Sequence, residues 1–346
     1  MPSNELLPTI AIVIPNHNDA RYLPDCLHSI LRQSVQPDQI IFVDDHSSDD
    51  SQELARKILE STPSAILRSN PRCLGTMGTL NEGLRYVTCD YVLFLSSNDF
   101  LGDGLIKTAK ESMARLGRPG VWSAMVWDAD DGISLALHNS PVIATRERFF
   151  SAKECIRLAH TVGNWFNGTT MLFDRKILLQ IGGVDPEYQG LADWLAALTA
   201  CSLRGAIFYP CPFGTVRNHA GGYLWRTLND RVRLERILQY MSLRGPKLSP
   251  KLFTKSFIVS MKNRVRYISF KMLAQGTWPH DVPEWQKSRY KVIQKLRNCL
   301  VSQRIQNFIT FLLLRPKDIF PTLWYKYIIF SYFVRRKNAP IPDRHS

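Results

Sequence analysis

Short apolar runs that alternate with helical patterns are the feature that most limits how this chain can fold. The runs are 9–14, 40–43, 65–67 and 91–95, and segments with apolar residues at helical spacing separate them. Strands that alternate with helices favour right-handed βαβ units and a largely parallel sheet. The sequence therefore predicts an α/β fold with a Rossmann-like, mostly parallel sheet flanked by helices.

Polar clusters follow three of these runs at the point where each predicted strand ends. They occupy residues 15–19, 44–49 and 96–99. Because ligands bind at the carboxyl ends of the strands in open α/β sheets, we expect Asp45 and Asp99 to line one crevice. No Gly-x-Gly-x-x-Gly follows the first run and no Gly-Lys-Ser/Thr closes a phosphate loop, so the sequence favours neither a dinucleotide enzyme nor a Walker-type ATPase.

Charge divides the chain near residue 216. Residues 1–216 contain 18 Lys and Arg against 24 Asp and Glu, whereas residues 217–346 contain 26 against 6. This asymmetry predicts two units, 1–225 and 226–346, and an anionic partner for the second. Residue 226 therefore begins a basic region, which we expect to contact the acceptor, a membrane surface or a partner protein.

The basic region is predicted to be mainly helical. Apolar residues recur at helical spacing from about 229, and prolines that include Pro246 interrupt the pattern. Further helices are expected near 251–274, 284–303 and 319–335. Residues 324–337 interleave aromatic and basic side chains, which suits either a helix in a membrane interface or a helix packed on the first unit. No nucleic-acid-binding module is recognisable, so we expect no nucleic-acid partner.

Cysteine usage and hydropathy indicate where such a protein works. The seven cysteines contain no Cys-x-x-Cys and no neighbouring His at zinc spacing, which predicts reduced, mostly buried thiols. The first residues lack the basic start and apolar run of a signal peptide, and no apolar stretch approaches the roughly 20 residues of a membrane span. We therefore expect a cytoplasmic protein, with peripheral contact to the inner face of the membrane as the alternative.

Six short motifs resemble the family 2 glycosyltransferases of GT-A fold, in the family's order and spacing over roughly residues 8–220. They are Ile14-Pro15-Asn16-His17-Asn18, Val43-Asp44-Asp45-His46-Ser47-Ser48-Asp49, Asn81-Glu82-Gly83 with Asp90-Tyr91-Val92, Phe94-Leu95-Ser96-Ser97-Asn98-Asp99, Gly182-Gly183-Val184-Asp185 and Ala192-Asp193-Trp194. The resemblance implies a GT-A fold and an inverting transfer from a nucleotide sugar.

The resemblance also implies a nucleotide site. The residues at its positions are Pro15, His17, Asn18, Asp45, Asn81, Arg85 and Asn98. His17 stands where an aromatic ring commonly stacks on the base, and Asp45 is expected to accept a hydrogen bond from a uracil-type imide. Three of these residues also have a structural alternative. His17 can be a loop histidine bonded to its own backbone, Asp45 can cap a helix, and Arg85 can be a solvated surface residue.

The family's metal motif usually reads Asp-x-Asp or Asp-x-Asp-Asp. Only its last acidic position, Asp99, is present here, with Asn98 before it. By resemblance, Asp99 holds a Mg²⁺ or Mn²⁺ ion that bridges the diphosphate, and His219 completes its ligands or holds the diphosphate. The missing carboxylates lower the cation affinity that we expect.

Asp193 stands at the position of the family's general base, and Trp194 follows it on the acceptor side. A carboxylate there can deprotonate an acceptor hydroxyl as that hydroxyl attacks the anomeric carbon; a helix N-cap is the alternative role. The resemblance thus predicts an inverting transfer from a UDP-, GDP- or dTDP-sugar to a glycan or lipid-linked acceptor in cell-surface polysaccharide synthesis. Ser96, Asn98 and Ala192 favour the alternative, a GT-A-like binding module or membrane-associated scaffold without turnover.

Overall fold

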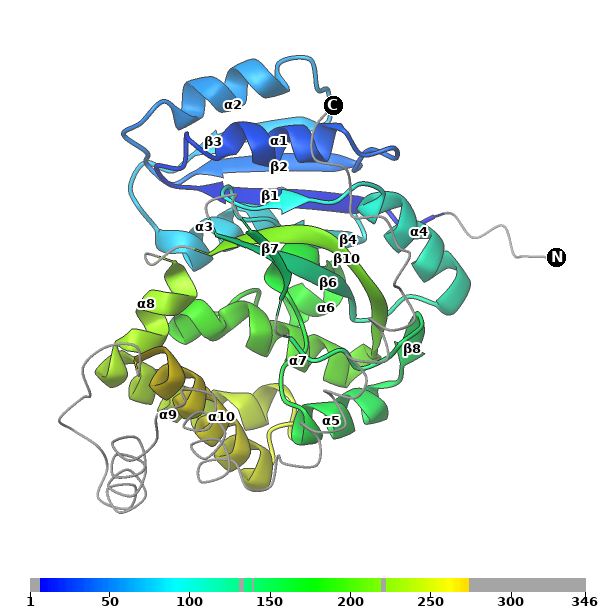
Figure 1. The fold of residues 1–346 in the computed structure, drawn as a ribbon, viewed down its shortest axis with the longest axis vertical. Helices are drawn as coiled ribbons and strands as arrows, with labels where there is room; N and C mark the ends of the chain where they lie inside the picture. Colours follow the sequence, from blue (N-terminus) through cyan, green and yellow to red (C-terminus); the bar gives the residue numbers. More distant parts are fainter. Residues whose placement is uncertain (1–6, 131–133, 139, 219–221, 274–346) are drawn as a thin grey trace.

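The computed structural model describes residues 7–130, 134–138, 140–218 and 222–273 (Figure 1). Ten strands within these ranges form one sheet. They are β1 (Ile10–Asn16), β2 (Gln39–Asp44), β3 (Ala65–Ser69), β4 (Tyr91–Phe94), β5 (Phe100–Leu101), β6 (Val121–Asp130), β7 (Ser134–Leu137), β8 (Arg148–Phe150), β9 (Leu172–Asp174) and β10 (Ala206–Asn218). The main path across the sheet is β3-β2-β1-β4-β9-β6-β10-β5, with β7 beside β6 and β8 beside β10.

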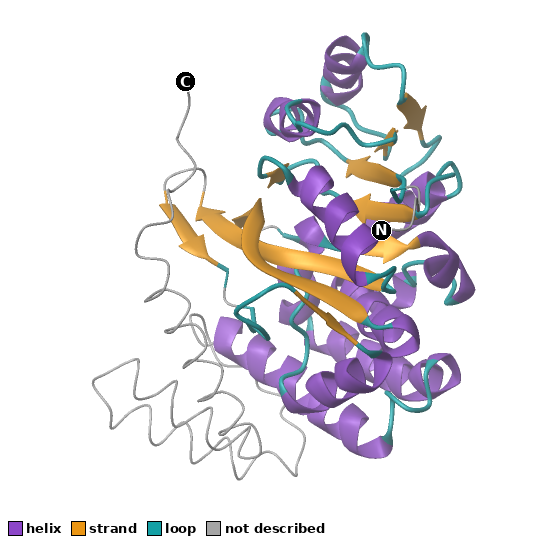
Figure 2. Ribbon diagram, turned by 90° about the vertical axis from the view of Figure 1, so that its right-hand side faces the viewer, coloured by secondary structure: helices purple, strands orange, loops and turns teal. Residues whose placement is uncertain are grey.

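Helices cover both faces of this sheet, as Figures 1 and 2 show. They are α1 (Leu23–Leu31), α2 (Ser51–Leu59), α3 (Gly75–Leu84), α4 (Leu105–Leu116), α5 (Ala152–Thr161), α6 (Arg175–Gln180), α7 (Ala192–Arg204), α8 (Tyr223–Asn229), α9 (Arg231–Leu248) and α10 (Lys255–Leu273). Two 3₁₀ helices, η1 (Gly168–Thr170) and η2 (Pro186–Leu191), lie between them in the chain.

Two apolar clusters, one on each face, follow from the alternation of side chains along β1. Ile10, Ile12 and Ile14 face α1, α2 and α4, whereas Ala11 and Val13 face α3 and the helices from α5 onward. Successive side chains of a strand point to opposite faces, so an uninterrupted apolar run such as β1 needs cover on both sides. The expected α/β architecture with flanking helices is therefore present.

The sheet is parallel over its first half and mixed beyond it. β3, β2, β1 and β4 pair in parallel, as the alternating strands and helices predict. β9 then enters antiparallel between β4 and β6, and β5, β7 and β8 also pair antiparallel. The expectation of a mostly parallel sheet therefore holds for β3, β2, β1 and β4 and for the long parallel pair of β6 with β10. No local pattern reports where a short antiparallel strand such as β9 inserts.

The first helices of the basic region share the core of the fold. Leu234, Ile237 and Leu238 of α9 and Phe257 of α10 belong to the same apolar cluster as Val13. Apolar burial of this kind is the main favourable term in folding, so α9 and α10 contribute to the stability of the preceding fold. The apolar core thus continues across the predicted boundary at residue 225. The division into two units stays a prediction.

A buried arginine fastens α10 to the end of α5. The Arg264 guanidinium donates to the carbonyl oxygens of Ala159, His160 and Thr161 at 2.9, 3.0 and 2.7 Å. These carbonyls lie at the C-terminus of α5, where the helix leaves acceptors unpaired and its dipole favours a cation. One basic side chain of the second half therefore neutralises the end of a helix inside the fold.

Other expectations for the basic region have mixed outcomes. Pro246 lies inside α9 rather than ending a helix, while α10 agrees with the helix expected near 251–274. The helices expected near 284–303 and 319–335, and the aromatic and basic segment 324–337, lie outside the described residues. Within the described ranges, no helix combines the length and the apolar content needed to cross a bilayer.

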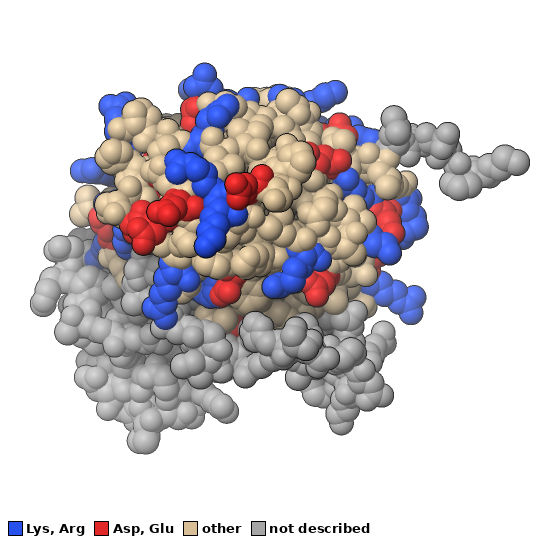
Figure 3. All heavy atoms as spheres, turned by 90° about the horizontal axis from the view of Figure 1, so that it is seen from above, with Lys and Arg blue, Asp and Glu red and all other residues tan. Residues whose placement is uncertain are grey.

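Charge on the N-terminal half is mixed. Figure 3 shows basic and acidic side chains interspersed on the face that is seen from above, over α1 and α2. This agrees with the near balance of charge in residues 1–216. The described cysteines are free thiols; Cys26, Cys89, Cys155 and Cys201 are buried, as expected.

Gly83 of α3 provides a test of this packing. A Cβ atom at Gly83 would lie 2.4 Å from Val13 Cγ1 and 3.2 Å from Val43 Cγ2. We expect Gly83→Ala to lower the free energy of unfolding by about 1–2 kcal/mol, because overpacking outweighs the gain in helix propensity. Urea denaturation measures the difference, and Thr76→Ala on the same helix serves as the control. Equal denaturation midpoints for Gly83→Ala and Thr76→Ala would contradict the close packing of α3 on the sheet.

Candidate active site

The ends of β1 and β2 are joined by side chains of the two turns that follow them. Asn16 Nδ2 donates to Asp44 Oδ1 at 2.9 Å, and the Ser48 N–H donates to Asn18 Oδ1 at 2.8 Å. The Ser47 N–H also donates to Asp44 Oδ2 at 2.9 Å, so Asp44 shapes the turn that follows β2. The two polar clusters therefore meet at one edge of the sheet, with Asn18 exposed between them.

Asp45 organises the loop between β3 and α3. Its Oδ1 accepts from Leu74 N at 2.7 Å and Asn70 Nδ2 at 2.8 Å, and its Oδ2 accepts from Gly75 N at 2.8 Å and Cys73 Sγ at 3.1 Å. Burial disfavours the charged carboxylate, but these hydrogen bonds outweigh it and lower the pKa of Asp45. Asp45 is thus a fixed anion, and its bond to a nucleobase stays a prediction.

Asp45 does not cap α2, the alternative role that the sequence allowed. Asp50 is the N-cap residue of α2, and Asp49 Oδ1 accepts from the Ser51 N–H at 3.1 Å. The carboxylate of Asp45 instead points toward the loop that follows β3. The sequence could not separate these options, because several acidic residues follow β2.

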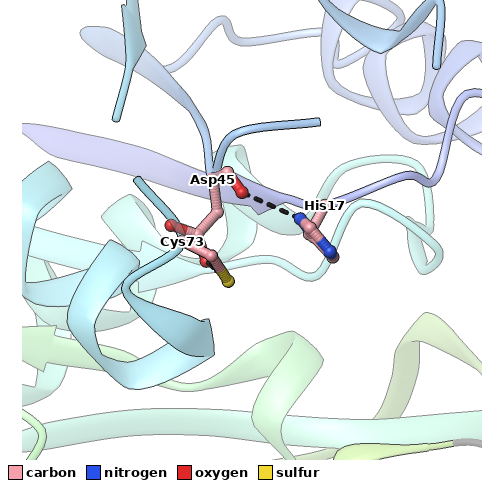
Figure 4. Close-up of side chains that lie close together, drawn as sticks. All are labelled: His17, Asp45 and Cys73. Atoms are coloured by element: carbon pink, nitrogen blue, oxygen red, sulfur yellow. Dashed lines mark hydrogen bonds between the residues drawn. The ribbon is translucent and has the colours of Figure 1, made fainter. Parts of the chain in front are cut away.

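His17 lies beside Asp45 at the same edge (Figure 4). Its Nδ1 donates to the backbone carbonyl of Asp45 at 2.8 Å, and its ring is exposed. One ring nitrogen of His17, a carboxylate oxygen of Asp45 and Sγ of Cys73 lie within 4.8 Å of one another. Pro15, the next predicted nucleotide residue, is buried at the end of β1.

Asn81 and Arg85, predicted to approach the pyrophosphate, make other contacts in the structure. Asn81 Nδ2 donates to Val184 O at 2.7 Å, and Asn81 Oδ1 accepts from Val184 N at 3.0 Å. The Arg85 side chain is 76% exposed and pairs with Glu82 one turn away. Asn81 thus joins α3 to the Gly182–Asp185 motif by two hydrogen bonds. Arg85 agrees with its alternative role as a solvated surface residue.

Asp99 is buried at the end of β4, where two distant segments meet its carboxylate. Its Oδ1 accepts from the Arg217 N–H of β10 at 2.9 Å, and its Oδ2 accepts from Thr169 Oγ1 of η1 at 2.8 Å. Burial, with a smaller contribution from the nearby carboxylate of Asp19, raises the pKa of Asp99 to about 6 despite these hydrogen bonds. Asn98, the preceding residue, is half-buried.

The Arg217 side chain covers this position from the β10 side. Its Nη1 donates to Asn98 O at 2.9 Å, and its Nη2 pairs with Asp25. The guanidinium also lies 5.2 Å from the Tyr22 ring centroid and 4.9 Å from that of Phe100. Such contacts stabilise a cation over the ring faces. Arg217 is therefore part of the surroundings of Asp99, while His219 lies outside the described residues.

Asp193 lies against Gly168, the residue of η1 next to Thr169. A Cβ atom built on Gly168 would lie 3.1 Å from Asp193 Oδ2, so the carboxylate packs directly on this glycine. The Trp194 N–H donates to Asp193 Oδ1 at 2.8 Å, and Trp194 itself is half-buried. Burial raises the pKa of Asp193 to about 6. Leu191 is the N-cap residue of α7, so Asp193 does not have the capping role considered from sequence.

Two further features of this edge escaped the sequence patterns. Thr169 joins η1 to Asp99, yet an isolated threonine gives no signal of such a bond. Gln189, four residues before Asp193, has φ 49° and ψ −127°, a conformation that non-glycine residues rarely adopt. Strained backbone of this kind clusters at functional sites, which draws attention to the segment that leads into α7.

The residues at Asp99 fit a hard divalent cation. Within the described residues, each oxygen of the Asp99 carboxylate accepts one hydrogen bond, from Thr169 or Arg217, and has a second lone pair for a ligand bond. Oxygen donors suit Mg²⁺ and Mn²⁺. A cation would also relieve the repulsion from Asp19 that raises the pKa of Asp99.

Sequence comparison identifies a family over the first half of the chain. Residues 11–182 match the family model described as Glycosyl transferase family 2. A curated relative from Haemophilus influenzae, named an uncharacterized glycosyltransferase, is 34% identical over 97 residues, which are 28% of this chain and 39% of that protein. For two further curated relatives the match spans 28% and 33% of their own length.

Two solved structures match the fold over most of the chain. Mannosyltransferase PcManGT from Pyrobaculum calidifontis, in complex with GDP-Man and Mn²⁺, has a TM-score of 0.56 at 16% identity, covering 92% of this chain and 89% of that one. TarS from S. aureus, in complex with UDP, has a TM-score of 0.56 at 13% identity, covering 98% and 94%. The α/β fold expected from the sequence is therefore confirmed as the fold of these glycosyltransferases. Over residues 11–182, the chain is thus similar to glycosyl transferase family 2.

Proposed function

We propose that this protein is an inverting glycosyltransferase that moves a sugar from a nucleoside-diphosphate sugar to a hydroxyl of a glycan or lipid-linked acceptor. The observation that carries the proposal is the shared contact of η1 with both candidate carboxylates. Thr169 bonds Asp99, and the neighbouring Gly168 packs on Asp193. A carboxylate for the diphosphate end and a proton acceptor that contact adjacent residues of one short turn suit a single transferred sugar bound beside that turn.

In this mechanism Asp193 takes the proton of the acceptor hydroxyl as that oxygen attacks the anomeric carbon from the face opposite the diphosphate. Its raised pKa suits a general base, because a base is most effective when its pKa lies near the working pH. Trp194 borders the acceptor and limits the access of water. A Mg²⁺ or Mn²⁺ ion held by Asp99, with His219 as the proposed second ligand, would neutralise the diphosphate as it leaves.

The donor binds across the turns that follow β1, β2 and β4 in this proposal. His17 and Asp45 hold the base, and Asn98 contacts the ribose or diphosphate. Support for a nucleotide sugar comes from the matched structures, which contain GDP-Man and Mn²⁺ in PcManGT and UDP-GlcNAc in a further TarS structure. We therefore propose a UDP-, GDP- or dTDP-sugar as donor.

The acceptor belongs to cell-surface polysaccharide synthesis in this proposal. Support comes from a curated relative named minor teichoic acid biosynthesis protein GgaB, 27% identical over 96 residues. The exposed Val232 and Leu243 lie among the basic residues of α9, which suits peripheral contact with an anionic lipid-linked acceptor at the cytoplasmic face of a membrane.

Asp193→Asn is the direct test of the base. We expect transfer to fall at least 100-fold, since the amide cannot accept the proton, while donor affinity stays within about twofold of the unchanged protein. Nucleoside diphosphate release and donor calorimetry with Mn²⁺ measure the two effects. Asp103→Asn, at an exposed carboxylate, is the matched control. Transfer that persists in Asp193→Asn would refute the base, and donor binding without turnover in the unchanged protein would favour an inactive binding module.

The pH dependence of activity follows from the two raised pKa values. Asp99 and Asp193 must both be ionised, the first to bind a cation and the second to accept a proton. Because each pKa is about 6, kcat/KM should fall below pH 6, by up to about 100-fold per pH unit once both groups are protonated. Extra Mn²⁺ should restore part of the kcat/KM that is lost when Asp99 is protonated, and none of the kcat/KM that is lost when Asp193 is protonated. A flat profile between pH 5 and about 8 would contradict both assignments.

Stability should show the opposite trend. A carboxyl whose pKa rises on folding from 3.8 to about 6 binds its proton more tightly in the folded state. The contribution of Asp193 to stability is therefore fully present below pH 3.8 and is lost as the pH rises through 6. We expect Asp193→Asn to raise Tm by about 2–4 °C at pH 8 relative to the unchanged protein, with a smaller gain at pH 5. A Tm difference that does not depend on pH would contradict the raised pKa.

A further inference from the structure

His17, Asp45 and Cys73 form a compact cluster of nitrogen, oxygen and sulfur donors away from Asp99. They come from the turn after β1, the turn after β2 and the loop between β3 and α3, and Figure 4 shows the three side chains gathered at one place. One donor atom from each lies within 4.8 Å of the other two. This mixed donor set differs in kind from the oxygen donors at Asp99.

The hydrogen bonds of His17 fix its tautomer. A backbone carbonyl only accepts, so Nδ1 carries the proton in its bond to Asp45 O at 2.8 Å. Nε2 then has the one lone pair of the ring, and an ion bound there would replace the 3.3 Å hydrogen bond from Asn18 Nδ2. Because Figure 4 shows Nδ1 facing Asp45, the exposed ring must turn to bring Nε2 to the ion. Histidines that bind metals commonly donate their other ring N–H to a backbone carbonyl, which fixes the tautomer in this way.

A hydrogen bond already joins Cys73 to Asp45, and a metal ion could take the place of its proton. The thiol donates to Asp45 Oδ2 at 3.1 Å, and this bond raises the pKa of Cys73. A tetrahedral zinc ion with its usual bond lengths holds a sulfur and an oxygen ligand about 3.5 Å apart. Exchange of the thiol proton for an ion therefore needs a movement of only a few tenths of an ångström between these atoms.

The cluster combines one rigid ligand with two adjustable ones. Asp45 is buried and held by Asn70, Leu74 and Gly75, whereas His17 and Cys73 are exposed. The fixed carboxylate stays in place while the ring and the thiol close on an ion from solvent. A carboxylate and a thiolate together balance a divalent charge, and imidazole with thiolate favours zinc over magnesium or manganese.

We propose that His17, Asp45 and Cys73 bind a thiophilic divalent cation such as Zn²⁺, with water as the fourth ligand. Binding breaks the Cys73 S–H bond, forms a sulfur–zinc bond and releases one proton to solvent. The proposed function has His17 and Asp45 hold the nucleotide base, so the ion and the nucleotide cannot bind at the same time. This competition rests on the proposed function. Zinc is thus an inhibitor that acts at the base end of the donor site.

The metal site is tested on the full chain with Zn²⁺ calorimetry and with Co²⁺ as a spectroscopic probe. We expect one Zn²⁺ per chain, release of one proton, and a near-ultraviolet thiolate-to-cobalt absorption band. Cys73→Ser should remove the band and weaken Zn²⁺ at least tenfold, and His17→Phe should weaken it similarly. Cys211→Ser, at a half-buried thiol, is the matched control and should keep both. Equal Zn²⁺ affinity in Cys73→Ser and the unchanged protein would overturn the site.

The competition is tested separately, with free Zn²⁺ held constant by a metal buffer so that the nucleotide does not merely chelate the ion. Saturating UDP, GDP or dTDP should weaken Zn²⁺ binding at least tenfold. A Zn²⁺ affinity that depends on Cys73 but is unchanged by every nucleotide would contradict the competition between ion and nucleotide. It would also contradict the base contacts of His17 and Asp45, but it would leave the metal site intact. A nucleotide that binds to a chain without a Cys73-dependent zinc site would overturn the metal site and leave the proposed transferase intact.

Discussion

The buried carboxylate of Asp99 is the constraint on which the functional edge depends. A buried charge is costly unless hydrogen bonds satisfy it, and here the partners come from β10 and η1, more than 60 residues away in the chain. The backbone N–H of Arg217 and the hydroxyl of Thr169 thereby hold the end of β4, the end of β10 and the turn under Asp193 in one arrangement. The proposed metal ligands and the tertiary hydrogen bonds are the same two oxygen atoms of Asp99, so a change at this residue should affect both.

Hydrogen bonding sorts the three carboxylates of this edge by task. Asp45 accepts four bonds from its own loop, which lower its pKa and fix it as a permanent anion. Asp99 accepts two and Asp193 one, and burial raises the pKa of each to about 6. A carboxylate with few partners in a buried place keeps lone pairs for an ion or a proton. The same residue type thus supplies an anchor, Asp45, a proposed cation ligand, Asp99, and a proposed base, Asp193.

Sequence patterns predicted the parts of this edge that depend on local order. The apolar runs and the polar residues after them were enough for β1, β2 and β4 and for the position of Asp45 and Asp99 beyond the same edge of these parallel strands. That both residues line one crevice stays a prediction. The patterns could not show that β9 inserts antiparallel, that Thr169 bonds Asp99 or that Asn81 bonds Val184. Asn81 and Val184 are 103 residues apart, and only tertiary packing brings them together.

The basic half of the chain acts on the candidate base through η2. The Gly190 N–H donates to Thr227 Oγ1 of α8 at 3.1 Å, and a Cβ at Gly190 would lie 2.8 Å from Leu224 Cα. This contact holds the neighbouring Gln189 in a backbone conformation that costs about 1–3 kcal/mol. The burial of α8 to α10 in the common core offsets that cost. The geometry of Asp193, which follows η2 directly, is therefore set partly by helices beyond residue 222, where the charge of the chain has already turned basic.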